Sequence, residues 1–157
     1  MNCSCTSYPA LKLTRASINK RISESRALAK KLLVLAEQDV SKLKLWQCPH
    51  CSHYWQTGRE WNFSNKEYLF QVPAIEIKDW LSEPYTQPAT WLIYSAMMAD
   101  YEARNTFEAS NKPCRVENCA QPAIKMSGVC KSHHIEQLQR FNILPKRPSG
   151  RPWGEYP

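Results

Sequence analysis

Seven cysteines and one closely spaced histidine constrain this 157-residue chain more than any other feature of its sequence. Four of these residues form the pattern Cys114-x4-Cys119-x10-Cys130-x2-His133. A tetrahedral zinc site requires two short ligand pairs, because each pair binds from one turn and the loop between them closes the ring. The spacing therefore predicts a structural zinc site. His134 competes for the fourth position, but Cys-x2-His is the commoner geometry and favours His133.

The other cysteines indicate a second and less regular site. Cys48-x2-Cys51 lies between two aromatic segments, as in one knuckle of a zinc ribbon. The chain contains no second Cys-x2-Cys, so we expect Cys3 and Cys5 to fold back and complete a four-cysteine site. The alternatives are that Cys48 and Cys51 bind the metal with His50 or His53, or that the site is empty and the thiols of Cys3 and Cys5 are free. The prediction is thus two structural Zn²⁺ ions per chain.

Residues 113–140 contain the predicted ligand spacing and also resemble a known type of zinc-binding module. The segment Pro-Cys-Arg-Val-Glu-Asn-Cys-Ala-Gln-Pro-Ala…Gly-Val-Cys-Lys-Ser-His resembles a short zinc-binding module of phage and bacterial proteins, which often lies beside nuclease or DNA-binding domains. Asn118 stands where that module commonly has glycine, and His134 stands where it commonly has an aromatic residue. We expect Gly128 to allow a backbone turn with positive φ before the third ligand. The resemblance implies a metal-braced knuckle and implies no activity.

Charge is unevenly distributed along the chain. Residues 1–47 carry nine basic and three acidic side chains, residues 48–110 carry four and eight, and residues 111–157 carry eight and three. The formal net charge of +7 falls to +4 if all seven cysteines bind two zinc ions as thiolates. The basic ends are suited to contact a polyanion, or alternatively to dock on the acidic middle of the same chain.

The sequence also predicts the compartment. An odd number of cysteines, without a basic and apolar leader at the N-terminus, argues against a disulfide framework. The longest helix-like apolar run, residues 32–36, is far shorter than the ~20 residues that span a membrane. We therefore expect a cytoplasmic protein with no membrane partner and no small-molecule substrate.

The apolar pattern predicts an α+β fold. Apolar residues three or four apart predict a long N-terminal helix over residues 14–42, with Thr14 as its N-cap. Alternating apolar residues predict a small zinc-braced antiparallel sheet within residues 44–80, which includes a strand at Ile75 and Ile77.

A second helix is predicted over residues 89–109, where a broad apolar stripe indicates burial against more than one element. A short helix is expected over residues 132–141. The predicted domains are residues 1–110, a helix with a ribbon-like α+β region, and residues 111–143, the C-terminal zinc knuckle. Residues 144–157 are basic and rich in proline, which predicts an extended tail.

Neither predicted metal site is typical of an enzyme, because both are closed and rich in thiolates. His134-Ile-Glu136 matches half of a nucleobase-deaminase signature, but no Pro-Cys-x-x-Cys follows it. The His133-His134 pair beside a cysteine knuckle resembles HNH nucleases. These need a further asparagine and a final histidine; Asn142 is present, but no histidine follows residue 134. We predict a non-enzymatic protein, with a degenerate HNH-like nuclease as a minor alternative.

The leading functional hypothesis is a nucleic-acid-binding regulator of phage or bacterial type. The predicted phosphate contacts are the basic residues Lys30, Lys31, Arg115, Lys125, Lys131, Arg140 and Arg147. The alternative is an adaptor or inhibitor that docks on a larger protein complex. Trp61 and Phe63 are the aromatic residues most expected to be exposed, because they lie in a polar loop. Trp153 and Tyr156 in the tail are expected either to pack on the protein's own surface or to anchor a partner.

Overall fold

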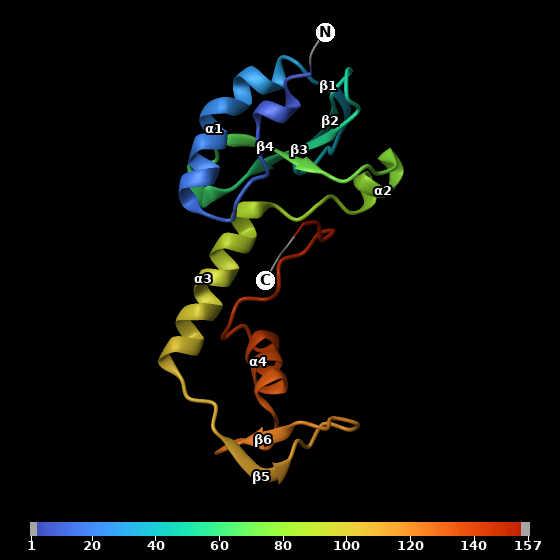
Figure 1. Cartoon of the computed structure of the whole chain (residues 1–157). Helices are drawn as coiled ribbons and strands as arrows, with labels where there is room; N and C mark the ends of the chain where they lie inside the picture. The colour runs from blue at the N-terminus through green and yellow to red at the C-terminus, as the bar shows by residue number, and fades with distance from the viewer. Residues whose placement is uncertain (1–2, 155–157) are drawn as a thin grey trace. The chain divides into compact units, whose positions relative to one another are not determined.

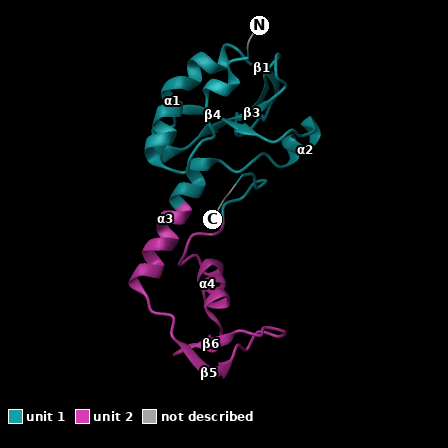
Figure 2. Cartoon of the chain, viewed as in Figure 1, with its two compact units in different colours: residues 1–93, 148–157 teal, residues 94–147 magenta. Residues whose placement is uncertain are grey.

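The computed structural model describes residues 3–154 of the chain (Figure 1). It divides into two compact units (Figure 2): unit 1 comprises Met1–Ile93 and Pro148–Pro157, and unit 2 comprises Tyr94–Arg147. The boundary lies within one helix, and the C-terminal tail belongs to unit 1. This division differs from the predicted one, in which the tail was a separate segment and the first domain extended to residue 110.

Unit 1 begins with the short 3-10 helix η1 (Cys5–Ser7) and the helix α1 (Arg15–Ala29). As predicted, Thr14 caps α1, and its side chain accepts a hydrogen bond from the backbone N–H of Ser17. The predicted end of this helix at residue 42 is wrong. Its expected C-terminal part forms the strand β1 (Leu33–Glu37) instead.

Strand pairing explains why α1 ends early. β1 lies at the edge of the sheet and pairs antiparallel with β2 (Lys44–Gln47). The turn between them is closed by a hydrogen bond from the Gln38 N–H to the Leu43 carbonyl, and Lys42 takes a positive φ of 59°. Apolar residues at positions 33–36 suit a helix or a strand equally well, so pairing with β2 decides the outcome.

The sheet has four strands in the order β1-β2-β3-β4, each antiparallel to its neighbour. β3 (Tyr54–Arg59) and β4 (Glu67–Val72) flank the short helix η2 (Trp61–Phe63). α1 packs against β4, and Leu28 of α1 shares an apolar cluster with Trp55 and Leu69 on that face of the sheet.

Gln56 organises the opposite face of the sheet, where it is fully buried. Its side-chain amide donates to the Tyr85 carbonyl at 2.8 Å, and its Oε1 accepts from Trp80 Nε1 at 2.8 Å and from the Tyr85 N–H at 3.0 Å. Trp80 belongs to α2 (Ile77–Ser82), so the strand predicted at Ile75 and Ile77 is wrong. The helical turn places the Trp80 indole N–H against the Gln56 amide oxygen. The predicted strand did not include this contact.

The C-terminal tail packs on unit 1. Trp153 stacks on Phe70 with 5.1 Å between ring centroids, and its indole N–H donates to the Thr86 carbonyl at 2.9 Å. Arg151 forms a parallel β-bridge with the segment that precedes the second long helix. Trp153 therefore contacts the protein's own core, one of the two roles expected for it. Tyr156 lies outside the described residues.

Unit 2 contains a small hairpin followed by a helix. β5 (Ala109–Pro113) pairs antiparallel with β6 (Pro122–Ile124), and α4 (Lys131–Arg140) follows. α4 occupies almost the range predicted for the short helix. The unit is entered through α3 (Pro88–Arg104), which crosses the unit boundary. Within residues 3–154, no helix is long and apolar enough to cross a membrane.

α3 is less buried than its apolar stripe predicted. Pro88, Ala89 and Trp91 in its first turn are buried, but the alanines at positions 96, 99 and 103 are exposed. The predicted burial of this stripe is therefore wrong for these three alanines. Alanine has the highest helix propensity, so these residues stabilise the helix without requiring a packing partner.

Candidate metal centres

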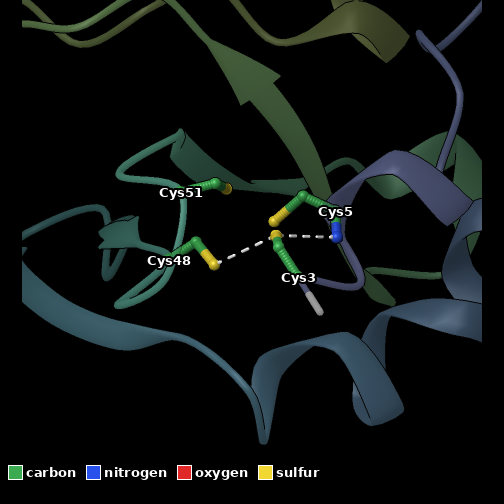
Figure 3. A group of neighbouring side chains, drawn as sticks. All are labelled: Cys3, Cys5, Cys48 and Cys51. Carbon is green, nitrogen blue, oxygen red and sulfur yellow. Dashed lines mark hydrogen bonds between the residues drawn. The ribbon is translucent and has the colours of Figure 1, made fainter. Parts of the chain in front are cut away.

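The first candidate centre, the four-cysteine cluster, consists of Cys3, Cys5, Cys48 and Cys51, whose sulfurs all lie within 4.8 Å of one another. In Figure 3 the sulfur of Cys48 points toward that of Cys3. These two sulfurs are 3.6 Å apart, far beyond the ~2.05 Å of a disulfide. A tetrahedral zinc ion with Zn–S distances of about 2.3 Å separates its sulfur ligands by about 3.8 Å. The cluster therefore has the dimensions of a metal site.

The turn between β2 and β3 positions one half of this cluster. The Cys48 N–H donates to the His53 carbonyl, and the Ser52 N–H donates to the Cys48 carbonyl. Ser52 takes a positive φ of 61°, which closes the turn and brings both sulfurs of the Cys48-x2-Cys51 pair together. His53 Nδ1 lies 3.1 Å from the Cys51 sulfur, outside the group of four. The structure thus brings together the four sulfurs, rather than the alternative with a neighbouring histidine.

Arg21 holds the other half in place, a role that the sequence analysis missed. Its side chain is 3% exposed and donates to the Leu69 carbonyl at 2.9 Å and to the Pro9 carbonyl at 2.5 Å. Its guanidinium carbon lies 5.6 Å from the centre of the Trp55 ring. Burial lowers the pKa of Arg21, and the carboxylate of Glu24 partly offsets this. The only signal in the sequence was an arginine within the apolar stripe of α1.

The thiols of the four-cysteine cluster differ in acidity. Burial opposes ionisation of Cys48, but the backbone N–H groups of Cys51 and His50 outweigh it and lower the pKa of Cys48 to about 6. Burial raises the pKa of Cys5 and of Cys51. Because the thiolate is the form that binds a metal, Cys48 would be ready to bind one at neutral pH, and metal binding would release protons from Cys5 and Cys51.

The second candidate centre, the cysteine–histidine cluster, consists of Cys114, Cys119, Cys130 and His133, again within 4.8 Å of one another. His133 Nδ1 lies 3.2 Å from the Cys130 sulfur and 3.4 Å from the Cys114 sulfur. The sulfurs of Cys119 and Cys130 are 3.9 Å apart. In a tetrahedral zinc site these distances are about 3.5 Å for sulfur to nitrogen and about 3.8 Å for sulfur to sulfur.

The hairpin and α4 supply these ligands. Cys130 is the N-cap of α4, and its backbone N–H donates to the Cys114 sulfur at 3.3 Å. His133 lies in the first turn of α4, as its three-residue spacing from Cys130 predicted. Asn118, which precedes Cys119, takes a left-handed φ of 61°. Asparagine tolerates this conformation better than most residues.

Gly128 does not play the part expected of it. It does not adopt the positive φ that the sequence analysis assigned to it. A Cβ at this position would instead collide with the guanidinium of Arg115. The Arg115 N–H also donates to the Gly128 carbonyl at 2.9 Å. A Cβ here would require only that the end of the exposed Arg115 side chain move, so neither turn geometry nor backbone packing requires glycine at this position.

His134 points away from the cysteine–histidine cluster. Its Nε2 lies 3.2 Å from the Tyr101 hydroxyl, and its ring meets the edge of the Phe107 ring. His133 is therefore the histidine that the fold brings to the three sulfurs. Burial opposes ionisation of Cys114, but N–H groups of Val116 and Cys130, with the His133 ring, lower the pKa of Cys114 to about 6.

Two of the predicted phosphate contacts lie beside the four-cysteine cluster. Lys30 and Lys31 follow the last turn of α1 and are exposed. Together with His50 they line a pocket of about 350 Å³ that Cys5 and Cys48 also line. Within residues 3–154 neither lysine forms a salt bridge, so both charges are available at this pocket.

The predicted contacts in unit 2 are less available. Lys125 pairs with Glu108 at 2.5 Å, and Lys131 pairs with Glu102 at 3.4 Å. Lys131 also lies over the ring of Phe107. The other predicted contacts in this unit are exposed: Arg115, Arg140 and Arg147.

The two aromatic residues expected to be exposed differ. Trp61 is 72% exposed, as predicted. Phe63 is 4% exposed, so this prediction is wrong. It belongs to the apolar core of unit 1, and the guanidinium of Arg15 lies 4.9 Å from the centre of its ring. The short helix η2 turns these neighbouring aromatic side chains in different directions.

Comparisons with models of protein families, with curated proteins and with solved structures return no match for this chain. The resemblance of residues 113–140 to a zinc-knuckle module stays a prediction. The structure shows an α+β fold with an antiparallel sheet, and two groups of four cysteine and histidine ligands that could hold metal ions.

Proposed function

We propose that each cluster binds one structural Zn²⁺ ion and that the zinc-braced protein binds nucleic acid through unit 1. Four thiolates, or three thiolates and an imidazole, at tetrahedral spacing are the ligand sets that zinc prefers. Each set would fill all four coordination positions. No position then remains for a substrate or an activated water, which supports a non-catalytic role.

The basic pocket beside the four-cysteine cluster is the observation that supports nucleic-acid binding. Lys30, Lys31 and His50 converge on it from the end of α1 and from the knuckle. A zinc ion with four thiolates carries a net charge of −2, so the two lysines would also offset this charge. Phosphate binding and charge compensation make different predictions for salt dependence, because phosphate contacts release counterions from the nucleic acid.

The test compares the full chain with Lys30→Ala/Lys31→Ala, using fluorescence anisotropy with labelled duplex and single-stranded oligonucleotides over a range of salt. Loss of two phosphate contacts should lower the slope of log affinity against log salt by about 1.8 for duplex or about 1.4 for single strands. Lys12→Ala/Lys20→Ala removes the same charge elsewhere on the surface and should change the slope much less.

The zinc content of each variant must be measured with the binding. Unchanged affinity in Lys30→Ala/Lys31→Ala, with zinc retained, would reject the proposed contact. Affinity that does not fall with salt would reject nucleic-acid binding itself.

Unit 2 favours the alternative function, an adaptor or inhibitor that docks on a protein. Acidic partners offset two of its predicted phosphate contacts. Phe141 and Ile143, which follow α4, are 70% and 67% exposed. Exposed apolar side chains near one another are typical of protein-binding surfaces. A nuclease-treated pull-down with the full chain, compared with Phe141→Ser/Ile143→Ser, tests this role: a stoichiometric partner lost in the variant would support it.

A further inference from the structure

A groove between α1 and β2 has no role in the metal centres. It encloses about 250 Å³. Its walls include an indole ring, three apolar side chains and two cationic ones: Trp46, Ile22, Ala29, Leu69, Arg26 and Lys44. Such a combination of a flat aromatic surface with positive charge fits a planar ligand that carries an anionic group.

The groove also has a polar group of its own. Thr57 lines it and is 3% exposed. Its hydroxyl oxygen accepts a hydrogen bond from Trp46 Nε1 at 3.0 Å. A hydroxyl accepts and donates, and within the described chain the Thr57 hydroxyl donates to no acceptor. This proton is therefore available to a ring nitrogen or carbonyl of a ligand that lies against Trp46.

The positive charge at the groove is only partly offset by neighbouring carboxylates. Arg26 is exposed and forms no salt bridge within residues 3–154. Lys44 Nζ lies 5.9 Å from the centre of the Trp46 ring and 3.9 Å from a carboxylate oxygen of Glu37. Glu67 also lines the groove, but its carboxylate lies 2.6 Å from the guanidinium of Arg59.

We propose that this groove binds a nucleoside monophosphate unit, with the base stacked on Trp46 and the phosphate held by Arg26 and Lys44. The inference rests on the proposed function in one respect. Ala29 lines the groove and the next residue, Lys30, lines the basic pocket, so the two sites adjoin at the end of α1. The unit is either a free nucleotide or one nucleotide of a single strand, and the chemistry that recognises it is the same.

The zinc-loaded full chain is titrated by calorimetry with 5′-AMP, with adenosine and with a short single-stranded oligonucleotide. AMP should bind with a stoichiometry of one, and adenosine should bind about tenfold more weakly, because it lacks the charged group. Arg26→Ala and Lys44→Ala should each weaken AMP binding by about tenfold. Lys20→Ala, an exposed cation on α1 that does not line the groove, should have no effect.

Trp46→Leu should weaken both AMP and adenosine by at least about fivefold, because stacking does not depend on the phosphate. The exposed Arg26 and the partly buried Lys44 can be replaced independently, so their variants keep the test valid if Trp46→Leu does not fold. Binding of AMP with the expected variant profile identifies a free nucleotide as a ligand. Binding of the oligonucleotide alone with that profile identifies a strand.

The inference would be overturned if neither AMP nor the oligonucleotide bound at millimolar concentration. It would also be overturned if neither Arg26→Ala nor Lys44→Ala changed the affinity. This failure is separable from failure of the proposed function. If Lys30→Ala/Lys31→Ala loses nucleic-acid affinity while the groove variants do not, only the groove assignment falls. If the groove variants lose AMP binding while Lys30→Ala/Lys31→Ala is unchanged, only the basic-pocket contact falls.

Discussion

In unit 1 the four-cysteine cluster adjoins an apolar core that contains Leu28, Trp55 and Leu69. In unit 2 the apolar cluster at the cysteine–histidine site consists of Val129 and the ligands Cys114 and Cys130 themselves. We therefore propose that a metal ion would act differently at the two clusters, although their dimensions are the same. In unit 1 a metal would fasten the N-terminal segment to a sheet that has its own interior. In unit 2 a metal would replace the interior, as in small domains that cannot bury enough apolar surface.

The surroundings of the two clusters support this contrast. Unit 1 encloses large side chains on both faces of its sheet: the fully buried Trp55 lies on one face, and Phe70 and Trp80 lie on the other. Each buried large apolar side chain contributes roughly 1.5–3 kcal/mol. In unit 2, α4 has no fully buried residue among those described. We therefore propose that the stability of α4 depends mostly on a metal ion bound at the cysteine–histidine cluster.

Removal of metal should have the largest effect, and this effect should differ between the two units. With a chelator, or in Cys130→Ser, amide hydrogen exchange in β6 and α4 should approach that of an unfolded chain, because binding energy at such sites is folding energy. Exchange in β3 and β4 should remain slow.

The matched variant Cys51→Ser should loosen only the N-terminal segment, because Arg21 and the core still hold α1 on the sheet. Retention of slow exchange in α4 without metal would contradict the contrast. So would simultaneous loss of protection in both units.

Gln56→Leu should destabilise unit 1 by about 3 kcal/mol, because it leaves the Trp80 indole N–H and the Tyr85 N–H buried without their acceptor. Urea unfolding followed by tryptophan fluorescence measures the change. Gln71→Leu, at a partly buried position of the same sheet, should change the free energy of unfolding by less than about 1 kcal/mol. Equal effects of the two variants would show that the buried amide does not organise this core.

Arg21→Met should weaken zinc binding at the four-cysteine cluster by about tenfold and leave the cysteine–histidine cluster unchanged. The reason is that Arg21 ties Pro9, and with it the segment that carries Cys3 and Cys5, to β4. Competition with a chromophoric chelator measures both sites. Arg15→Met is the control on the same helix. Equal weakening at the two clusters would indicate general destabilisation instead of local positioning.

The smallest expected effect concerns pH. In the zinc-free chain Cys48 should react with iodoacetamide with a midpoint near its pKa of about 6, because unit 1 stays folded. Cys114 should react near the ordinary thiol pKa of about 8.5, because its fold is lost without metal. A lowered pKa means that the Cys48 thiolate stabilises the fold fully above the ordinary pKa and that this contribution is lost as pH falls through about 6. Equal midpoints would contradict the contrast.

The ligand sets were predictable because ligand spacing is a local property. A Cys-x2-Cys or Cys-x2-His pair reaches one metal from a single turn, whatever the surrounding fold. The choice of His133 over His134 follows from the same three-residue spacing. The joining of Cys3 and Cys5 to Cys48 was reached by elimination, and the structure brings these sulfurs together.

Long-range pairing was not predictable from the chain. No glycine or proline marks the end of α1 at Ala29, and only the pairing of β1 with β2 makes residues 33–37 a strand. The buried roles of Gln56 and Arg21 likewise depend on partners 12 to 48 residues away in sequence. From the sequence alone such polar residues are expected at the surface, because their hydrogen-bond partners come close only when the chain folds.

Elemental analysis of the purified full chain tests the central claim most directly, when native mass spectrometry is performed in parallel. The account predicts two zinc ions per chain, one in Cys3→Ser/Cys5→Ser and one in Cys130→Ser. The ion lost should belong to unit 1 in the first variant and to unit 2 in the second. A wild-type chain without zinc, or two zinc ions retained in Cys3→Ser/Cys5→Ser, would contradict it.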